Sequence, residues 1–384
     1  MTAWLQPGAW IGVIGGGQLG RMLALEARRM GYRVCVLDPD PRGPAAQVAD
    51  EHIAGPYDGT DALQELAHRA DVITYEFEHI NADAVAAVEQ LRPVYPGSAL
   101  LRMTQHRVRE KETLARLGFP LPAFHPVASY ADVEAGIQRV GLPAVLKTAT
   151  GGYDGKGQVV VGTTAEAHAA FDLLWPMSPT LVLEEYVRLG KELSVVCARN
   201  ARGQVACYPP AENIHRRGVL DITLAPALVP AVVATQAHNL ATRLVQELKV
   251  VGLLAVEFFL TESGRLLVNE LAPRPHNSAH YTLDACVTSQ FEQLVRVLCN
   301  LPLGETEPLA PSVMVNLLGD LWEDTDGAPN FARALEVPGV TLHLYGKAEP
   351  RPGRKMGHLC AVAPTLEVAH ARALRARDLA AGKA

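Results

Sequence analysis

The sequence predicts an α/β protein whose N-terminal part is an open parallel sheet of the Rossmann-like type. Over the first hundred residues, short apolar runs that suit strands alternate with longer periodic runs that suit helices. A glycine-rich turn, GGGQLG at residues 15–20, joins the first strand to the first helix, which is typical of a βαβ unit. Further along, residues 255–271 place a short polar turn between two apolar runs, which indicates a β-hairpin.

Length and composition narrow the class of protein. The 384 residues allow two or three domains, and 48% apolar against 20% charged residues allow a large core. A net charge of −6 disfavours a general nucleic-acid or membrane-surface binder. No run approaches the roughly 20 apolar residues of a membrane span, and the N-terminus lacks the pattern of a signal peptide. We therefore expect a cytoplasmic protein with no nucleic-acid and no membrane partner.

The cysteines are scattered along the chain, with no CxxC pair and no metal-binding spacing. This pattern predicts buried, reduced thiols, as in a cytosolic protein. The six residues are Cys35, Cys197, Cys207, Cys286, Cys299 and Cys360.

The glycine-rich turn follows a predicted strand at residues 10–14 and opens a predicted helix that ends at Gly31. Gly15, Gly17 and Gly20 match the GxGxxG dinucleotide fingerprint, and Asp38 lies at the spacing of its ribose-binding acid. One interpretation is NAD binding. A second is a pocket where backbone N–H groups hold another phosphate, and a third is a tight turn without a ligand.

The rest of the first part continues the βα pattern. A predicted strand at residues 72–77 leads into Glu76 and Glu78, at the edge where open α/β sheets bind ligands. The alternative for both acids is a solvated loop. Residues 98–117 are predicted to be one helix whose charges, Arg107 and Lys111 among them, are mostly solvated.

In the middle of the chain, a predicted strand ends at Lys147 and is followed by TATGGYDGKGQ at residues 148–158. The backbone N–H groups of such a glycine-rich loop can close over phosphates, and Lys147 and Lys156 add positive charge. The alternative is a flexible hairpin. A Walker sequence, GxxxxGK[ST], does not occur.

Two further segments have locally ambiguous roles. The predicted strand at residues 180–187 runs into Glu184 and Glu185, and its edge either offers backbone groups to an adenine ring or is an ordinary strand end. The polar loop at residues 212–218 carries His215, which taken alone suits a loop histidine better than a ligand.

The predicted hairpin at residues 255–271 carries two glutamates in strongly apolar strands. If Leu260 and Arg265 close a four-residue loop, Glu257 lies opposite Val268, and Glu270 lies two places further along the same face. The two carboxylates then form a diagonal pair roughly 7–8 Å apart at Cβ. Buried acids need a partner, and converging carboxylates suit magnesium. The alternative, two salt-bridged acids on a solvated face, stays open on the hairpin alone.

The C-terminal part is predicted to be small and β-rich. A proline-containing linker at residues 301–311 precedes strands at 312–318, 340–345 and 359–364 and a closing helix at 365–380. Residues 346–358 form a basic, glycine-punctuated turn. It is either a solvated turn or a site for an anionic substrate, with the charges of Lys347, Arg351, Arg354 and Lys355.

Taken together, these motifs resemble a known superfamily. The AVLK strand, the GGYDGKGQ loop, the LEEYV edge, Glu192, Glu257 and the pair at 269–270 follow the order of ATP-grasp enzymes. GGGQLGRM (15–22), NELAPRPHNSAH (269–280), TSQFEQ (288–293) and RKMGH (354–358) resemble 5-(carboxyamino)imidazole ribonucleotide synthases over nearly the whole chain. The resemblance implies an N-terminal pre-ATP-grasp domain at 1–110, an ATP-grasp domain at 111–300 with a lid at about 120–190, and a C-terminal domain at 301–384.

The resemblance also implies an activity, that of an ATP-dependent carbon–nitrogen ligase of purine biosynthesis. ATP phosphorylates bicarbonate to carboxyphosphate, whose carboxyl group passes to the exocyclic amine of 5-aminoimidazole ribonucleotide. The implied cofactors are ATP and Mg²⁺, with Mn²⁺ as a substitute. A homodimer is implied, and a mutase that acts on the product is a candidate partner.

The resemblance assigns roles to individual residues of this chain. Glu257 and Glu270 would hold magnesium, while Arg274 and His276 would hold bicarbonate or carboxyphosphate. Tyr153 and Asp154 would lie beside the ribonucleotide, where Asp154 could orient the amine or take its proton. Contacts to the ribonucleotide would come from Gly17, Gln18, Glu76, Lys347, Arg351, Arg354 and Lys355. Contacts to ATP would come from Arg107, Lys147, Gly152, Tyr153, Asp154, Gly155, Lys156, Gly157, Gln158, Glu184, Glu185, Tyr186, Val187, Glu192, His215, Asn269 and Glu270.

One position departs from the family pattern, because Ala279 stands where the HNSGH motif often has glycine. The change should be mild unless that residue needs a positive φ. The resemblance also reassigns the turn at Gly15–Gly20 from NAD to the ribonucleotide phosphate. The alternative functions are another ATP-grasp ligase that uses formate or an amino acid, an NAD-dependent oxidoreductase, and a non-enzymatic nucleotide-binding regulator.

Overall fold

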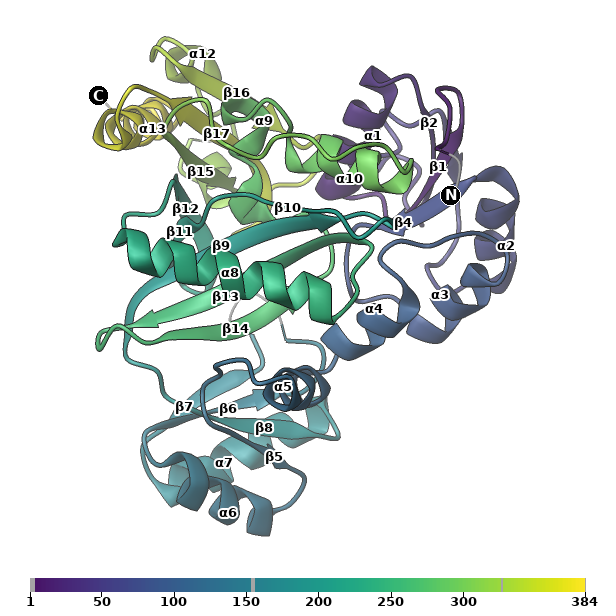
Figure 1. Ribbon diagram of the computed structural model, residues 1–384. Coiled ribbons are helices and arrows are strands. Elements are labelled where there is room, and N and C mark those ends of the chain that lie inside the picture. The colour runs from purple at the N-terminus through teal and green to yellow at the C-terminus, as the bar shows by residue number, and fades with distance from the viewer. Residues whose placement is uncertain (1–3, 153–155, 326, 384) are drawn as a thin grey trace.

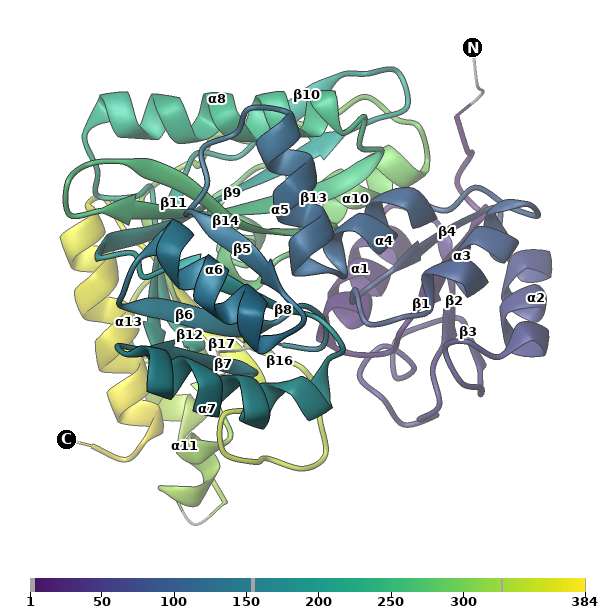
Figure 2. The same ribbon diagram turned by 90° about the horizontal axis from the view of Figure 1, so that it is seen from below.

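The computed structural model describes residues 4–152, 156–325 and 327–383. Its strands form three sheets, and the small second sheet stands apart as a lobe at the bottom of Figure 1. The N-terminal sheet and the C-terminal helix lie on opposite sides of the molecule in both views (Figures 1 and 2). Among the described residues, the helices are all too short or too polar to cross a bilayer.

The N-terminal part is the open parallel sheet that the sequence predicts, with strand order β3-β2-β1-β4. The strands are β1 (Trp10–Ile14), β2 (Arg33–Leu37), β3 (Glu51–Ile53) and β4 (Val72–Tyr75). The helices are α1 (Gln18–Arg29), α2 (Thr60–Arg69), α3 (Ala82–Glu89) and α4 (Ser98–Thr104). Helix α1 packs on the sheet because Leu19, Met22, Leu23 and Ala27 recur every three or four residues and form one buried stripe.

The lobe is a four-stranded sheet of order β5-β8-β6-β7. Its strands are β5 (Phe124–Val127), β6 (Ala144–Thr148), β7 (Gln158–Val161) and β8 (Leu181–Glu185). Its helices are α6 (Tyr130–Val140), α7 (Thr164–Leu174) and a 3-10 turn (Trp175–Met177). Helix α5 (Arg107–Arg116) connects the lobe to the rest of the chain and touches both β8 and β14.

The third sheet has nine strands and includes the C-terminal ones, because β12 pairs with β15. Its order is β14-β13-β9-β11-β12-β15-β17-β16, with β10 paired to β9. The strands are β9 (Leu189–Arg199), β10 (Val205–Cys207), β11 (Ala211–Arg216), β12 (Val219–Ala225), β13 (Gly252–Thr261), β14 (Leu266–Ala272), β15 (Ser312–Leu318), β16 (Val340–Leu344) and β17 (Lys355–Val362). The helices are α8 (Ala231–Glu247), α9 (Thr282–Ala285), α10 (Gln290–Leu298), α11 (Asp320–Glu323), α12 (Phe331–Ala334) and α13 (Leu366–Ala380).

Helix α8 determines which face of this sheet is free to form a site. Its buried residues, including Ala237, Ala241 and Leu244, pack in one cluster with Val256 and Phe258 of β13. Because successive side chains of a strand point to opposite faces, Glu257 between them points away from α8. The acids of the hairpin therefore lie on the face that α8 leaves uncovered.

The hairpin of β13 and β14 corrects the predicted register. Its strands pair one residue away from the prediction, and that shift alone would place Glu257 opposite Asn269. A β-bulge at this point adds one residue to β14, so that Glu257 pairs directly with Glu270. Directly opposite residues share a face, so the predicted convergence of the two carboxylates is confirmed although the predicted diagonal geometry is wrong.

The predicted helix at residues 98–117 is two helices, α4 and α5, separated at Gln105 and His106. The His106 side chain caps α5 by accepting a hydrogen bond from the backbone N–H of Arg109. The expectation of solvated charges is wrong for Lys111, which is 1% exposed, and for Arg107, which is mostly buried. Val108, Lys111 and Leu114 recur every three residues, so the buried face of α5 includes the lysine.

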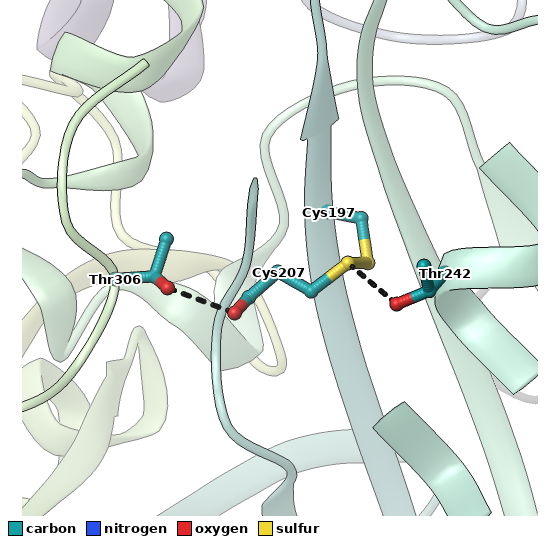
Figure 3. Close-up of a disulfide and its surroundings, with 4 residues drawn as sticks. All are labelled: Cys197, Cys207, Thr242 and Thr306. Carbon is teal, nitrogen blue, oxygen red and sulfur yellow. Dashed lines mark hydrogen bonds between the residues drawn. A yellow bond between two sulfur atoms is a disulfide. The ribbon is translucent and has the colours of Figure 1, made fainter. Parts of the chain in front are cut away.

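Two of the six predicted free thiols are joined instead. Cys197 on β9 and Cys207 on β10 are directly opposite in an antiparallel pair and form a disulfide (Figure 3). The Thr242 hydroxyl lies 3.4 Å from the Cys207 sulfur. The other four cysteines are buried and free, as predicted. Sequence spacing could not indicate the pair, because strand pairing rather than a local motif brings the two residues together.

Two smaller predictions concern the basic turn at residues 346–358 and the backbone conformation of Ala279. Strand β17 begins at Lys355, so the last part of the predicted basic turn belongs to a strand. Ala279 ends a 3-10 turn (Asn277–Ala279) and has no positive φ. The glycine that the family often carries at this position is therefore not required by the backbone here.

Candidate active site

One cavity of about 860 Å³ lies where the three sheets meet. The N-terminal sheet contributes its glycine-rich turn and the residues after β4, the lobe contributes the end of β6, and the large sheet contributes β13, β14 and the loop that follows. Seventeen of the predicted site residues line this cavity. They are Gly17, Gln18, Glu76, Arg107, Lys147, Gly152, Gln158, Glu192, His215, Glu257, Asn269, Glu270, Arg274, His276, Lys347, Arg354 and Lys355.

Other predicted site residues are not brought to the cavity wall. Arg351 is exposed and pairs with Glu349 on the outer side of the basic turn. Lys156, Gly157, Glu184, Glu185, Tyr186 and Val187 also do not line the cavity. Tyr153, Asp154 and Gly155 lie outside the described residues.

The two acids of the hairpin each face a cationic or ionisable partner. His276 Nε2 lies 3.0 Å from Glu257 Oε1, and Arg107 Nη1 donates to Glu270 Oε2 at 2.8 Å. Burial alone would raise the pKa of Glu257, but the hydrogen bond and charge of His276 outweigh it and hold the pKa at about 2. Glu257 is therefore ionised at neutral pH. It and Glu270 supply oxygen donors of the kind that Mg²⁺ prefers.

A buried group of charges lies beside the cavity at the end of the lobe. Lys147 Nζ lies 2.9 Å and Lys111 Nζ lies 3.2 Å from the same oxygen of Glu184. Burial opposes ionisation of Glu184, but the two ammonium groups outweigh it and hold its pKa at about 2. The side chain of Glu184 thus orients Lys147, which lines the cavity. Sequence reasoning missed Lys111, although its three-residue spacing from Val108 and Leu114 was a readable signal.

Glu110 is a second residue that the sequence interpretation missed. Its carboxylate is buried against the cavity wall and accepts a hydrogen bond from the Leu271 N–H at 3.3 Å. Burial, and then the charge of nearby Glu270, raise the pKa of Glu110 to about 8. The carboxyl is therefore protonated at neutral pH. It lines the cavity beside Leu271, the residue that follows Glu270.

The raised pKa of Glu110 predicts a pH-dependent stability. The folded protein favours the protonated carboxyl, so this contribution is fully present below the ordinary pKa of 4.5 and is lost as pH rises through about 8. The unaltered chain should therefore lose roughly 4 kcal/mol of unfolding free energy between pH 5 and pH 9, and we expect Glu110→Gln to abolish this loss. Urea unfolding at several pH values, with metal ions chelated, measures it.

The matched control for this experiment is Glu112→Gln, because Glu112 lies on the same helix but is exposed. It should keep the pH dependence of the wild-type chain. If Glu110→Gln keeps it as well, the carboxyl does not titrate with a raised pKa.

The N–H groups of the glycine-rich turn are satisfied by carboxylates of the chain itself. Gly16 N–H donates to Asp38 at 2.6 Å, and Gly20 N–H donates to Glu76 at 2.7 Å. The N–H of Gly17 also donates to Glu76, and an added Cβ at Gly17 would collide with this carboxylate. Two carboxylates at the turn disfavour phosphate binding on its backbone, whether of NAD or of another ligand. Gly17 and Gln18 still line the cavity.

The loop after β14 is tied to the N-terminal sheet. Arg274 binds Glu78 through two guanidinium nitrogens, of which Nη2 donates to Oε1 at 2.9 Å. Burial opposes ionisation of Glu78, but Arg274 outweighs it and lowers the pKa of Glu78 to about 2. The Nδ1 atom of His276 forms a hydrogen bond with the Ser278 hydroxyl, 2.8 Å away. These bonds fix both predicted bicarbonate ligands in the lining of the cavity.

Basic side chains from the C-terminal part of the chain form another part of the cavity lining. Lys347, Arg354 and Lys355 line the cavity, and Lys347 Nζ donates to the backbone oxygen of Lys355 at 2.7 Å. Burial, and then the charge of Arg354, lower the pKa of Lys347 to about 8. The negative charge of Glu76, which follows β4, partly offsets this by raising the pKa of Lys347. The basic turn is therefore part of the site rather than a fully solvated turn.

His215 is also part of the site, contrary to its local interpretation as an ordinary loop residue. It lies on β11, lines the cavity and forms a close ion pair with Glu192 of β9. Burial lowers the pKa of His215, but Glu192 outweighs it and the net shift is upward.

Models of three protein families match consecutive parts of the chain. They are the ribonucleotide synthetase preATP-grasp domain at residues 9–105, the ATP-grasp domain at 112–291 and the phosphoribosylaminoimidazole carboxylase C-terminal domain at 312–372. The chain is 46% identical to the N5-carboxyaminoimidazole ribonucleotide synthase of Bacillus subtilis, over 92% of each chain. It is 41% identical to the Brucella melitensis enzyme of the same name, over 94% of this chain and 98% of that one.

The chain belongs to the N5-carboxyaminoimidazole ribonucleotide synthase family. The predicted family and the predicted ATP-grasp fold are thereby confirmed. An N5-carboxyaminoimidazole ribonucleotide synthetase solved as its ADP complex superposes with a TM-score of 0.92, at 44% identity and 98% coverage of both chains. An Aspergillus clavatus synthase solved with ADP and 5-aminoimidazole ribonucleotide gives a TM-score of 0.89, at 31% identity, covering 97% of this chain and 99% of that one.

Membership of the N5-carboxyaminoimidazole ribonucleotide synthase family makes this chain an ATP-dependent carbon–nitrogen ligase. This membership contradicts the alternative that the glycine-rich turn belongs to an NAD-dependent oxidoreductase. In the structure, Asp38 also argues against that interpretation, because its carboxylate accepts bonds from Gly16 and from the Tyr57 hydroxyl at 2.8 Å. The acid that would bind a ribose is already engaged.

Proposed function

We propose that this chain carboxylates 5-aminoimidazole ribonucleotide with ATP and bicarbonate. The products are N5-carboxyaminoimidazole ribonucleotide, ADP and phosphate, in the de novo synthesis of purines. One observation carries the proposal: in a member of this family, a pair of acids, the cations Lys147 and Arg107, and a basic group at residues 347–355 line a single cavity. A relative solved with both ADP and 5-aminoimidazole ribonucleotide supports the same pair of ligands.

ATP would bind in the part of the cavity that the lobe lines. Lys147 is held in place by Glu184, and Gly152 and Gln158 belong to the glycine-rich loop that would cover the phosphates. Phosphoryl transfer to a weak oxyanion needs positioning and charge neutralisation more than covalent chemistry. Lys147 and Arg107 supply positive charge here.

Magnesium fits the acids of the hairpin. Glu257 and Glu270 are direct cross-strand partners that face the cavity, and Asn269 beside them adds an amide oxygen. Oxygen donors of this kind, one or two of them acidic, are what Mg²⁺ takes together with substrate phosphates. When bound, the ion would neutralise charge on the phosphates. Mn²⁺ would suit the same donors.

The bicarbonate end is assigned to Arg274 and His276. Both are fixed by acids, Glu78 and Glu257, and both reach the cavity next to the hairpin. Carboxyphosphate formed here hydrolyses readily in water, so exclusion of water by the glycine-rich loop is part of the proposal. Asp154, which would orient the amine or accept its proton, remains a prediction.

The ribonucleotide is assigned to the wall between the first and last parts of the chain. Lys347, Arg354 and Lys355 suit its phosphate, since they bring positive charge into an acidic protein. Glu76 lies across the cavity, where burial raises its pKa. Its carboxylate also accepts bonds from the N–H groups of Gly17 and Gly20, and we expect it to face the amine or ribose rather than the phosphate.

The test is ADP release by the purified chain with Mg²⁺ and ATP. We expect release to require bicarbonate and to increase when 5-aminoimidazole ribonucleotide is added. Bicarbonate-free buffer and omission of the ribonucleotide are the controls. Turnover that ignores bicarbonate but responds to formate or an amino acid would instead indicate a sibling ATP-grasp ligase. Binding of ATP with no turnover on any of these substrates would indicate a regulator.

The remaining expectations form part of the same proposal. We infer three domains with boundaries near residues 110 and 300, a homodimer, a cytoplasmic location and hand-over of the product to a mutase. Family membership supports them, and each stays a prediction.

A further inference from the structure

We propose that Asp284, His343 and His358 form a binding site for a divalent transition cation of the Zn²⁺ class. The three residues come from α9, β16 and β17, so they meet only in the folded chain. Their ligand atoms all lie within 4.8 Å of one another. None of the three lines the cavity between the sheets, so this site would be separate from the one described above.

His358 is the residue that points most directly to a ligand. Its side chain is fully buried, and its Nδ1 lies 2.9 Å from the Tyr345 hydroxyl. Its Nε2 has no hydrogen-bond partner among the described residues. If Nδ1 carries the proton and donates it to the hydroxyl oxygen, Nε2 presents a lone pair. Histidines that bind metals are held in this way, with the second ring nitrogen donating to an oxygen.

Asp284 and His343 supply the other donors. His343 Nε2 lies 3.1 Å from Asp284 Oδ1 and 2.9 Å from Oδ2. His343 is also directly opposite His358 in the pairing of β16 with β17, and the two rings stack 4.5 Å apart at an angle of 11°. Two donors at about 2.1 Å from a tetrahedral zinc lie roughly 3.4 Å apart. The ligand atoms in the structure lie within 4.8 Å of one another, so binding would draw them closer together. The His343 side chain is 29% exposed, so it can move and gives the ion a route in.

A simple ion pair does not explain the whole cluster. Pairing of Asp284 with His343 accounts for those two side chains but leaves the buried Nε2 of His358 without a partner, which is costly. One cation would use all three groups. Two imidazoles and one carboxylate suit Zn²⁺ and its neighbours in the first transition row, whereas Mg²⁺ prefers oxygen donors alone.

The position of the cluster suggests a structural role. Helix α9 follows the loop that carries His276, and β17 begins at Lys355. An ion held by Asp284 and His358 would therefore tie together two segments that line the main cavity. Metal binding at this cluster does not depend on the proposed reaction, so failure of either proposal can be recognised separately.

Metal binding is measured on the full chain after chelation, with millimolar Mg²⁺ present to occupy the acids of the main cavity. We expect one equivalent of Zn²⁺ to bind in calorimetry, and Co²⁺ used in its place to give a visible absorption band. Asp284→Asn and His343→Gln should each weaken binding at least about tenfold. The matched control is His168→Gln, because His168 pairs with Glu134 on the lobe, with 3.7 Å between the charged atoms. It should leave the affinity unchanged.

Either of two results would overturn the proposal. The first is the lack of stoichiometric binding, and the second is binding that Asp284→Asn and His343→Gln do not weaken. Should these variants fail to fold, anomalous scattering from zinc-soaked crystals of the unaltered chain decides the question. A peak between Asp284, His343 and His358 supports the site, and peaks only elsewhere refute it.

Discussion

Replacing Glu270 by glutamine is expected to lower ATP turnover by about 10²-fold or more. The amide keeps the shape of the side chain but loses the negative charge that magnesium and Arg107 both use. Stability should change by less than about 1 kcal/mol, because the Glu270 side chain is 38% exposed in its ion pair. ADP release at saturating Mg²⁺, together with a urea melt, measures both effects.

Glu262→Gln is the control for this experiment. It makes the same chemical change in the turn of the same hairpin, where the side chain is exposed and away from the cavity. Its turnover should match that of the unaltered chain. Full activity of Glu270→Gln would show that Glu270 is not a metal ligand.

Replacing Lys111 by methionine is expected to lower the free energy of unfolding by roughly 3 kcal/mol. The substitution keeps the apolar stem but leaves the buried carboxylate of Glu184 with Lys147 as its remaining close cation. We also expect weaker ATP binding, because Lys147 would then be drawn more strongly to Glu184. Urea unfolding and ATP titration measure the two effects.

The second variant in this test is Lys111→Met combined with Glu184→Gln, which removes the uncompensated charge. Because breaking a buried pair is worse than removing it, the double variant should recover part of the lost stability. Arg109→Met on the exposed side of the same helix is the control and should be nearly neutral. A double variant less stable than Lys111→Met alone would contradict this account of the cluster.

Much of the candidate site could be read from local patterns. The AVLK strand, the glycine-rich loop and the segment with Arg274 and His276 are contiguous in sequence, and each carries its chemistry within a few residues. Their order along the chain identified the family, and the structure brings most of the assigned residues to one cavity. Glu257 and Glu270 were found because acids in apolar strands are costly and so need a reason.

The residues that were missed carry at most a weak local signal, such as the three-residue spacing of Lys111 from Val108 and Leu114. Lys111 and Glu110 look like surface charges of a helix, and only the packing of α5 against β8 and β14 buries them. The disulfide of Cys197 with Cys207 depends on which strand lies beside β9. The cluster of Asp284, His343 and His358 likewise depends on three elements that the chain order does not place together.

The two acids of the hairpin separate the contributions of sequence and tertiary structure. The sequence by itself determined the αβ alternation, the hairpin, the presence of two acids in it and the family. Only the tertiary structure decided that they are direct partners, because a one-residue shift in register and a one-residue bulge add up and bring Glu270 opposite Glu257. Polarity alternation encodes neither the shift nor the bulge. Packing likewise decided which charges are buried, since burial depends on surfaces supplied by segments far away in sequence.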